Sequence, residues 1–170
     1  MKIVLLGYMA SGKSSIGKRL SEVLDLNFID LDTYIESCDK MSIKDIFKNK
    51  GEIYFRRQES IYLQEVLAQA TDCVLSLGGG TPCYGNNTQL LNSTGYHTVY
   101  LRAGIATLVD RLTKEKQLRP LVAQLSSDQL TEYVAKHLFE RAAFYEQAKQ
   151  IISIDNKSVE EICKEIKLAL

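Results

Sequence analysis

Short apolar runs alternate along the chain with longer stretches whose apolar positions recur every three or four residues. The apolar runs predict buried strands at 2–6, 27–31, 73–77, 97–101 and 151–154. The helical spacing predicts helices at 13–24, 42–47, 52–69, 105–112, 130–147 and 158–168. Strands that alternate with helices form βαβ units, which place the strands in a parallel sheet covered on both faces. The pattern therefore predicts an α/β fold of three layers with five parallel strands.

Two of the predicted helices begin at a capping signal. Ser42 is followed three residues later by Asp45, and Ser158 is followed at the same spacing by Glu161. A serine in this position accepts a hydrogen bond from the backbone N–H groups that a helix start leaves unpaired. In a parallel sheet, ligands bind beyond the carboxyl ends of the strands. The phosphate loop, acidic pair and glycine run described below all follow predicted strands, so we expect them to meet at that edge.

The 170-residue chain has the composition of an ordinary globular protein, with 45% apolar and 25% charged residues, and we expect a single domain over 1–170. Its 21 basic and 21 acidic side chains cancel, which disfavours binding to nucleic acid or to an anionic membrane. No apolar run approaches the roughly 20 residues of a membrane span, and none resembles a signal peptide, which favours a cytoplasmic protein. The four cysteines and two histidines are scattered, which disfavours a zinc site.

Residues 7–14 match the phosphate-binding pattern G-x-x-x-x-G-K-[ST]. The loop follows a predicted strand and opens a predicted helix, as the motif requires; a chance match is the alternative. Its backbone N–H groups and the helix start would surround phosphate oxygens. Lys13 would reach the β- and γ-phosphates, and the Ser14 hydroxyl would bind Mg²⁺. The expected ATP-binding residues of this loop are Gly7, Ala10, Ser11, Gly12, Lys13, Ser14 and Ser15.

The rest of the chain narrows the class of phosphate-binding protein. A GTPase reads guanine with N-K-x-D, but here Asn156 and Lys157 are followed by Val159 in place of the aspartate. The pattern D-x-x-G does not occur, and the chain is short for a motor ATPase or a helicase. These features favour a kinase that acts on a small molecule or a nucleotide.

Two further motifs follow the second and third predicted strands. Asp30 and Asp32 lie two residues apart, so on an extended chain their carboxylates would point the same way. Beside Mg-ATP, one could hold the metal's water shell and the other could orient or deprotonate an acceptor hydroxyl; a pair that caps a helix is the alternative. Gly78, Gly79 and Gly80 would let a ligand approach the backbone closely, with a plain flexible turn as the alternative.

Several arginines are candidates for binding an anionic substrate. Arg56 and Arg57 lie in the long predicted helix, whereas Arg111, Arg119 and Arg141 lie in the last third of the chain. A guanidinium group binds carboxylates and phosphates through forked hydrogen bonds, although most arginines are solvated surface groups. Arg119 falls in a stretch without periodicity between two helices, where a lid could close over the transferring phosphate.

Together these residues resemble the shikimate kinase family over essentially the whole chain. The matching features are the 7–14 loop, the Asp30-x-Asp32 pair, F-R-x-x-E at 55–59, L-G-G-G at 77–80, L-R-P-L at 118–121 and R-x-x-x-Y at 141–145. That family transfers the γ-phosphate of ATP to the 3-hydroxyl of shikimate in aromatic amino-acid (chorismate) biosynthesis. The resemblance implies a fold like that of the nucleoside-monophosphate kinases, with a substrate-binding region at about 32–60 and a lid at about 113–126.

The resemblance also implies roles for individual residues. Asp32 would bind the acceptor hydroxyls, and it would act as the base or orient toward the base. Lys13 and Arg119 would be the other catalytic residues. Asp30, through water, and Ser14 would hold Mg²⁺. The adenine would lie between Arg111 and the loop 155–158, which contains Asn156. The shikimate-binding residues would be Asp32, Arg56, Glu59, Gly78, Gly79, Gly80 and Arg141. Of these, the two arginines would clamp the carboxylate, and Glu59 would orient Arg56.

Two positions depart from the family's pattern. Ala10 stands where the family often has glycine, and Leu31 stands between the two aspartates where a small polar residue is usual. We expect a minor effect from Ala10, and we expect Leu31 to point away from the ligand. ATP and shikimate are the implied partners, with the chain acting as a monomer. The alternatives that remain are a related small-molecule kinase, such as a gluconate kinase, and a non-catalytic nucleotide-binding module.

Overall fold

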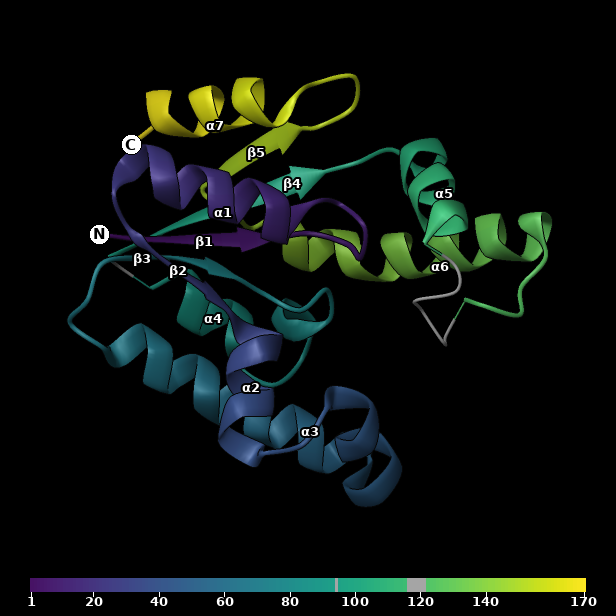
Figure 1. The fold of residues 1–170 in the computed structure, drawn as a ribbon. Coiled ribbons are helices and arrows are strands. Elements are labelled where there is room, and N and C mark those ends of the chain that lie inside the picture. Colours follow the sequence, from purple (N-terminus) through teal and green to yellow (C-terminus); the bar gives the residue numbers. More distant parts are fainter. Residues whose placement is uncertain (94, 116–121) are drawn as a thin grey trace.

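A five-stranded parallel sheet forms the centre of the computed structural model, which describes residues 1–93, 95–115 and 122–170. The strands are β1 (Lys2–Leu6), β2 (Asn27–Asp30), β3 (Cys73–Ser76), β4 (Tyr96–Arg102) and β5 (Gln150–Ser153). They lie in the order β2-β3-β1-β4-β5, and each neighbouring pair is parallel (Figure 1). The predicted fold class is confirmed, because helices lie on both faces of this sheet.

The helices form the two outer layers and one projecting unit. They are α1 (Lys13–Leu24), α2 (Leu31–Asp39), α3 (Ile43–Ala68), α4 (Asn87–Leu91), α5 (Ile105–Lys114), α6 (Ser127–Tyr145), α7 (Val159–Leu168) and a short 3₁₀ turn, η1 (Thr81–Cys83). α1 and α7 pack together on one face of the sheet, and α4 and α6 lie on the other (Figure 1). α2 and the first part of α3 extend away from the sheet. None of the described helices is both long enough and apolar enough to span a membrane.

The start of α2 corrects one prediction. The second strand was expected to reach residue 31, but it ends at Asp30, and Leu31 opens a helix that the apolar pattern did not predict. Asp30 is the N-cap, because its Oδ1 accepts hydrogen bonds from the backbone N–H groups of Asp32 (3.2 Å) and Thr33 (3.4 Å). The expectation that Asp30 and Asp32 share an extended chain is therefore wrong. Leu31 is fully buried in the core, and it is not among the residues that line the cavity described below.

A break at Gly51 divides α3 into the two helices that the sequence predicts. Gly51 has φ 83° and ψ 170°, a conformation that is essentially restricted to glycine. The first part begins at the expected cap, where the Ser42 hydroxyl accepts from the backbone N–H of Asp45 at 3.1 Å. The second part carries Arg56 and Glu59, so the angle at Gly51 determines how the first part sits relative to these side chains.

Candidate active site

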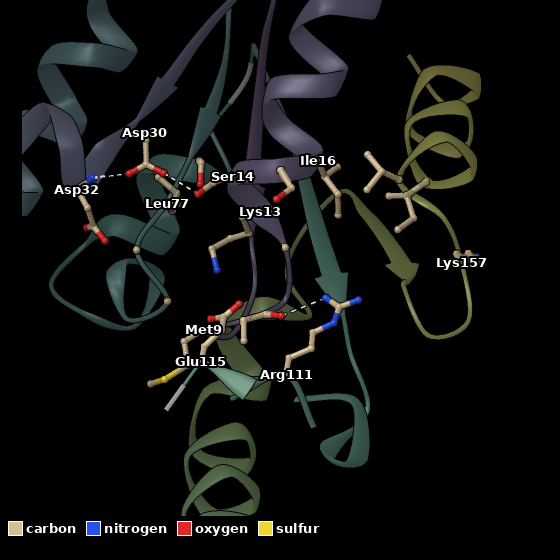
Figure 2. Close-up of a pocket in the computed structure, with 18 residues that line it drawn as sticks. Met9, Lys13, Ser14, Ile16, Asp30, Asp32, Leu77, Arg111, Glu115 and Lys157 are labelled. Atoms are coloured by element: carbon tan, nitrogen blue, oxygen red, sulfur yellow. Dashed lines mark hydrogen bonds between the residues drawn. The ribbon is translucent and has the colours of Figure 1, made fainter. Parts of the chain in front are cut away.

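A cavity of about 610 Å³ lies at the carboxyl ends of β1 and β3 (Figure 2). Four parts of the chain line it: the phosphate loop with the start of α1, the acidic pair, the end of β3 with the glycines, and side chains from α5 and the β5–α7 region. Its lining residues are Met9, Ala10, Gly12, Lys13, Ser14, Ser15, Ile16, Asp30, Asp32, Ser76, Leu77, Gly78, Gly79, Arg111, Glu115, Lys157, Val159 and Ile162. The predicted meeting of these motifs at one sheet edge is thus observed.

The phosphate loop curls tightly between β1 and α1. Ala10 has φ 61°, a left-handed conformation in which a Cβ is strained and glycine is favoured. The carbonyl of Ala10 accepts a hydrogen bond from Arg111 Nη1 at 3.1 Å (Figure 2). This bond ties α5 to the loop, and it places the Arg111 guanidinium at the opposite end of the cavity from the acidic pair.

The Lys13 ammonium lies inside the curl of the phosphate loop. Its Nζ donates to the carbonyl oxygens of Gly7 (2.9 Å) and Tyr8 (2.8 Å), and it lies 3.5 Å from the Ser11 hydroxyl. The side chain is almost fully buried, so two carbonyl dipoles stabilise its charge. Anionic phosphate oxygens would bind this ammonium more strongly than neutral carbonyls do, because the hydrogen bond would then join two charges.

Ser14 and Asp30 place two oxygen ligands at the edge of the cavity. The Ser14 hydroxyl donates to Asp30 Oδ2 at 2.9 Å (Figure 2). Oxygen donors suit Mg²⁺, which keeps several waters and takes one or two protein ligands besides the phosphates of a substrate. The described residues contain no group of three or more His, Cys, Asp or Glu side chains that could hold a metal ion. The Ser14 and Asp30 oxygens are donors of the kind that fit an Mg²⁺ ion arriving with a nucleotide.

Asp32 presents its carboxylate to the cavity from the first turn of α2 (Figure 2). Burial raises the pKa of this carboxyl to about 6, with further increases from the negative charges of Asp30 and Glu59, while the Lys13 ammonium acts in the opposite direction. A carboxylate with this pKa is ionised at neutral pH but binds a proton more readily than an ordinary aspartate. It is therefore suited to take a proton from, or to orient, a hydroxyl group.

The glycine run brings three charged side chains together. A Cβ atom at Gly78 would lie 3.0 Å from Asp32 Oδ1, and one at Gly79 would lie 3.7 Å from Arg141 Nη1. At Gly80 it would lie 2.8 Å from Arg56 Nη2, so a larger residue there would displace the guanidinium. Asp32, Arg56 and Arg141 thus surround one short stretch of backbone, although they come from α2, α3 and α6.

A buried carboxylate fixes Arg56. Glu59 is 1% exposed, and its Oε2 accepts a hydrogen bond from Arg56 Nη1 at 2.9 Å. Its other oxygen, Oε1, accepts from the Thr81 hydroxyl at 2.6 Å. Both oxygens are therefore engaged, and Glu59 joins α3 to the turn that follows the glycine run. Thr81 was not singled out from the sequence, because a lone threonine gives no signal there.

Two buried tyrosines, Tyr8 and Tyr145, are neighbours of Arg141. The guanidinium lies 5.5 Å from the centre of the buried Tyr8 ring, within the range of a cation–π interaction. Tyr145, one turn further along α6, is fully buried and donates its hydroxyl hydrogen bond to the carbonyl of Gly79. No sequence pattern indicates a role for Tyr8, which here connects the phosphate loop to α6.

Not all of the other predicted residues line the cavity. Asn156 is not among the lining residues, whereas its neighbour Lys157 is. Asp155 instead accepts two hydrogen bonds from the Gly104 backbone N–H, which joins the loops after β4 and β5. Lys157 lies in the loop 155–158 that was expected to flank the adenine, and Glu115 lies in the expected lid at about 113–126. Neither was predicted as an individual site residue, since charged residues in loops and at helix ends are common. Arg119, and residues 116–121 of the expected lid, lie outside the described residues.

The arrangement has two chemically distinct ends. One end, built from the phosphate loop and Arg111, is suited to a nucleoside polyphosphate. At the other end, Asp32, Gly78 and Gly79 line the cavity. Arg56 and Arg141 are not lining residues, but their guanidinium groups lie beside Gly80 and Gly79, so this end is suited to an anionic molecule that carries hydroxyl groups. The Lys13 ammonium and the Ser14–Asp30 pair lie between these ends, where the terminal phosphate of a nucleotide would face the acceptor.

Comparison with known proteins agrees with this chemistry. The shikimate kinase family model matches residues 9–170. A curated shikimate kinase from Flavobacterium johnsoniae is 44% identical over 97% of this chain and 96% of its own length.

Solved structures give the same result. A crystal structure of shikimate kinase from Bacteroides thetaiotaomicron has a TM-score of 0.91 at 35% identity and covers 100% of this chain and 99% of its own. The structure of Acinetobacter baumannii shikimate kinase in complex with shikimate has a TM-score of 0.87 at 29% identity, with coverages of 99% and 91%.

Proposed function

This chain belongs to the shikimate kinase family, and from that premise we propose that it transfers the γ-phosphate of ATP to the 3-hydroxyl of shikimate. The observation that carries the proposal is the convergence of Asp32, Arg56 and Arg141 on residues 78–80, next to the phosphate loop. Shikimate is a carboxylate that carries ring hydroxyls, so it needs both cationic and hydrogen-bonding partners. A gluconate kinase, the nearest alternative, is not favoured by the family match.

On the nucleotide side, we assign the loop residues Gly7, Ala10, Ser11, Gly12, Lys13, Ser14 and Ser15 to the phosphates of ATP. The Lys13 ammonium would exchange its carbonyl partners for β- and γ-phosphate oxygens and neutralise charge there. Arg111, and Asn156 in the loop beside Lys157, would lie against the adenine. When bound, Mg²⁺ held by Ser14 and, through water, by Asp30 would neutralise charge on the phosphates.

On the acceptor side, Arg56 and Arg141 would bind the shikimate carboxylate, and Glu59 would hold Arg56 in place. Backbone N–H groups of the glycine run would bind ring hydroxyls. Asp32 would then face the hydroxyl that attacks the phosphate, and would orient it or accept its proton. Positioning and charge neutralisation would supply most of the rate, since phosphoryl transfer needs little covalent chemistry from the protein.

Several further assignments belong to this proposal. Arg119 would contact the transferring phosphate from a lid at about 113–126, and the substrate-binding region would cover about 32–60 of the single domain 1–170. The family resemblance implies a monomer as the active unit. The use of ATP supports a cytoplasmic location, and the zero net charge supports the absence of a nucleic-acid partner.

The proposal is tested by coupled ADP release with Mg-ATP, comparing shikimate, gluconate and no acceptor. We expect release that depends on shikimate, with a phosphate monoester as the product by ³¹P NMR. Release that depends on gluconate alone would indicate the related kinase. If no acceptor supports release, although calorimetry shows that ATP binds, the chain is a non-catalytic nucleotide-binding module.

A further inference from the structure

The guanidinium of Arg56 has a neighbour that its role as an acceptor-binding group does not require. Its Nη1 is bound to the buried Glu59, and its Nη2 lies against Gly80. Its Nε is buried and makes no hydrogen bond to any residue in the described part of the chain. The nearest negative charge on this edge is Glu52, whose Oε1 lies 3.6 Å from Nε.

Tyr84 holds Glu52 in that position. The Tyr84 hydroxyl donates a hydrogen bond to Glu52 Oε1 at 3.2 Å. The Tyr84 ring lies on the Arg56 guanidinium, with 4.0 Å between the central carbon of the guanidinium and the ring centre. Tyr84, Glu52 and Arg56 therefore contact one another in a closed triangle, although they come from the turn after η1 and from α3.

We propose that Glu52, held by Tyr84, is a resident counter-ion of Arg56 that the carboxylate of the acceptor must displace. This inference rests on the proposed function, in which Arg56 binds that carboxylate. In the substrate-free protein, Glu52 and Tyr84 cover the Nε edge of the guanidinium. When the acceptor binds, its carboxylate takes the place of the Glu52 carboxylate beside Arg56. The affinity for the acceptor then reflects only the difference between the interaction free energies of these two carboxylates with Arg56.

The two residues act on affinity in opposite directions. The Glu52 side chain is 57% exposed and its contact with Nε is longer than a hydrogen bond, so water compensates well for its loss. Its negative charge nevertheless weakens the attraction of Arg56 for a second anion. The Tyr84 ring, in contrast, stacks on the cation and keeps it aimed at the site whether or not the acceptor is bound.

Glu52→Gln tests the proposal, because it keeps the shape of the side chain and removes its charge. We expect the KM for shikimate, and its calorimetric Kd without nucleotide, to fall about two- to fivefold, which corresponds to the interaction free energy of an exposed ion pair. The kcat should stay unchanged. Binding of the neutral carboxamide of shikimate should not change. Glu65→Gln, on the exposed side of the same helix, removes an equal charge and should leave both constants as in the wild type.

Tyr84→Phe provides a second arm, since it keeps the ring on Arg56 and releases Glu52 from its hydrogen bond. We expect a smaller decrease in KM in the same direction. An unchanged or raised KM in Glu52→Gln would overturn the proposal, since a merely structural Glu52 would weaken binding when altered. Wild-type protein that does not phosphorylate shikimate would instead refute the proposed function, which keeps the two failures distinct.

Discussion

The carboxyl of Asp32 illustrates how the fold adjusts a single side chain. Burial raises its pKa to about 6, and the negative charges of Asp30 and Glu59 act in the same direction. Asp30 is a sequence neighbour, but the burial and the charge of Glu59 reach Asp32 only when the chain folds. An aspartate at the end of a strand in the sequence carries no such information, so its presence could be predicted but its altered ionisation could not.

This pKa predicts how activity depends on pH. In its proposed role, Asp32 would accept a proton or orient a hydroxyl only when ionised, so activity should be fully present above the pKa and be lost as the pH falls through about 6. We expect kcat/KM for shikimate to decline tenfold per pH unit well below that value. The measurement is a pH profile from 5 to 9. Asp32→Asn should be slower by about 10²–10⁴-fold and should lack this limb of the profile.

The clamp arginines give a second test at the residue scale. Arg141→Lys keeps the charge but removes the forked geometry, so we expect the KM for shikimate to rise roughly tenfold to a hundredfold, as for loss of a hydrogen bond between charged groups, with little change in kcat. Steady-state kinetics at saturating ATP measure this. Arg57→Lys is the matched control, because Arg57 is exposed next to Arg56. A KM for Arg141→Lys equal to that of the control would remove Arg141 from the clamp.

At the scale of elements, helix starts and breaks position the site. Gly51 adopts φ 83° and ψ 170°, and a Cβ there would meet no atom within 4 Å. Any effect of a substitution is therefore due to the backbone. We expect Gly51→Ala to lower the free energy of unfolding by about 1–3 kcal/mol, measured by urea denaturation.

Gly85→Ala is the control for the Gly51 substitution. Gly85 also has open space around it, but its φ of 54° lies in the left-handed region that other residues can enter at a lower cost. A smaller loss of stability is expected there. Equal losses in the two variants would mean that the unusual conformation of Gly51 contributes nothing specific to the division of α3.

The elements also show what can be read from the sequence. The five strands, α1 and the two parts of α3 could be predicted because each follows one apolar pattern over several residues. α2 could not, because its first residue continues an apolar strand and only the cap at Asp30 separates the two. The short η1 and α4 were missed for a related reason: they contain too few residues to show a period.

At the scale of the whole molecule, the site is assembled from segments far apart in the chain. The phosphate loop, the acidic pair and the glycine run could be predicted because each is a motif at a strand end. The contacts of Thr81, Tyr8, Glu52 and Lys157 could not, since they depend on distances between α3, α6, η1 and the loop before α7. Local patterns thus locate the site, whereas its lining follows from packing.

Ligand binding should stabilise the whole domain through this site. With ligand at about 100 times Kd, ATP binding adds about 2.7 kcal/mol and should raise Tm by roughly 5–10 °C for a domain of this size. Lys13→Met should abolish the shift with Mg-ATP but keep the shift with shikimate, measured by scanning calorimetry. Lys18→Met, an exposed position on the same helix, should keep both. A full ATP shift in Lys13→Met would contradict the assigned role of Lys13.

The Asp30 carboxylate serves two neighbours at once, and this limits which amino acids the position can accept. One oxygen caps α2, and the other accepts from Ser14. Asparagine, serine or threonine could replace the cap, but none of them carries the charge that suits the hydration shell of a divalent cation. Glutamate carries the charge, but its extra methylene takes the oxygens away from the helix start. Aspartate alone can both cap α2 and supply the charge. Fewer amino acids are therefore acceptable at this position than either role would allow by itself.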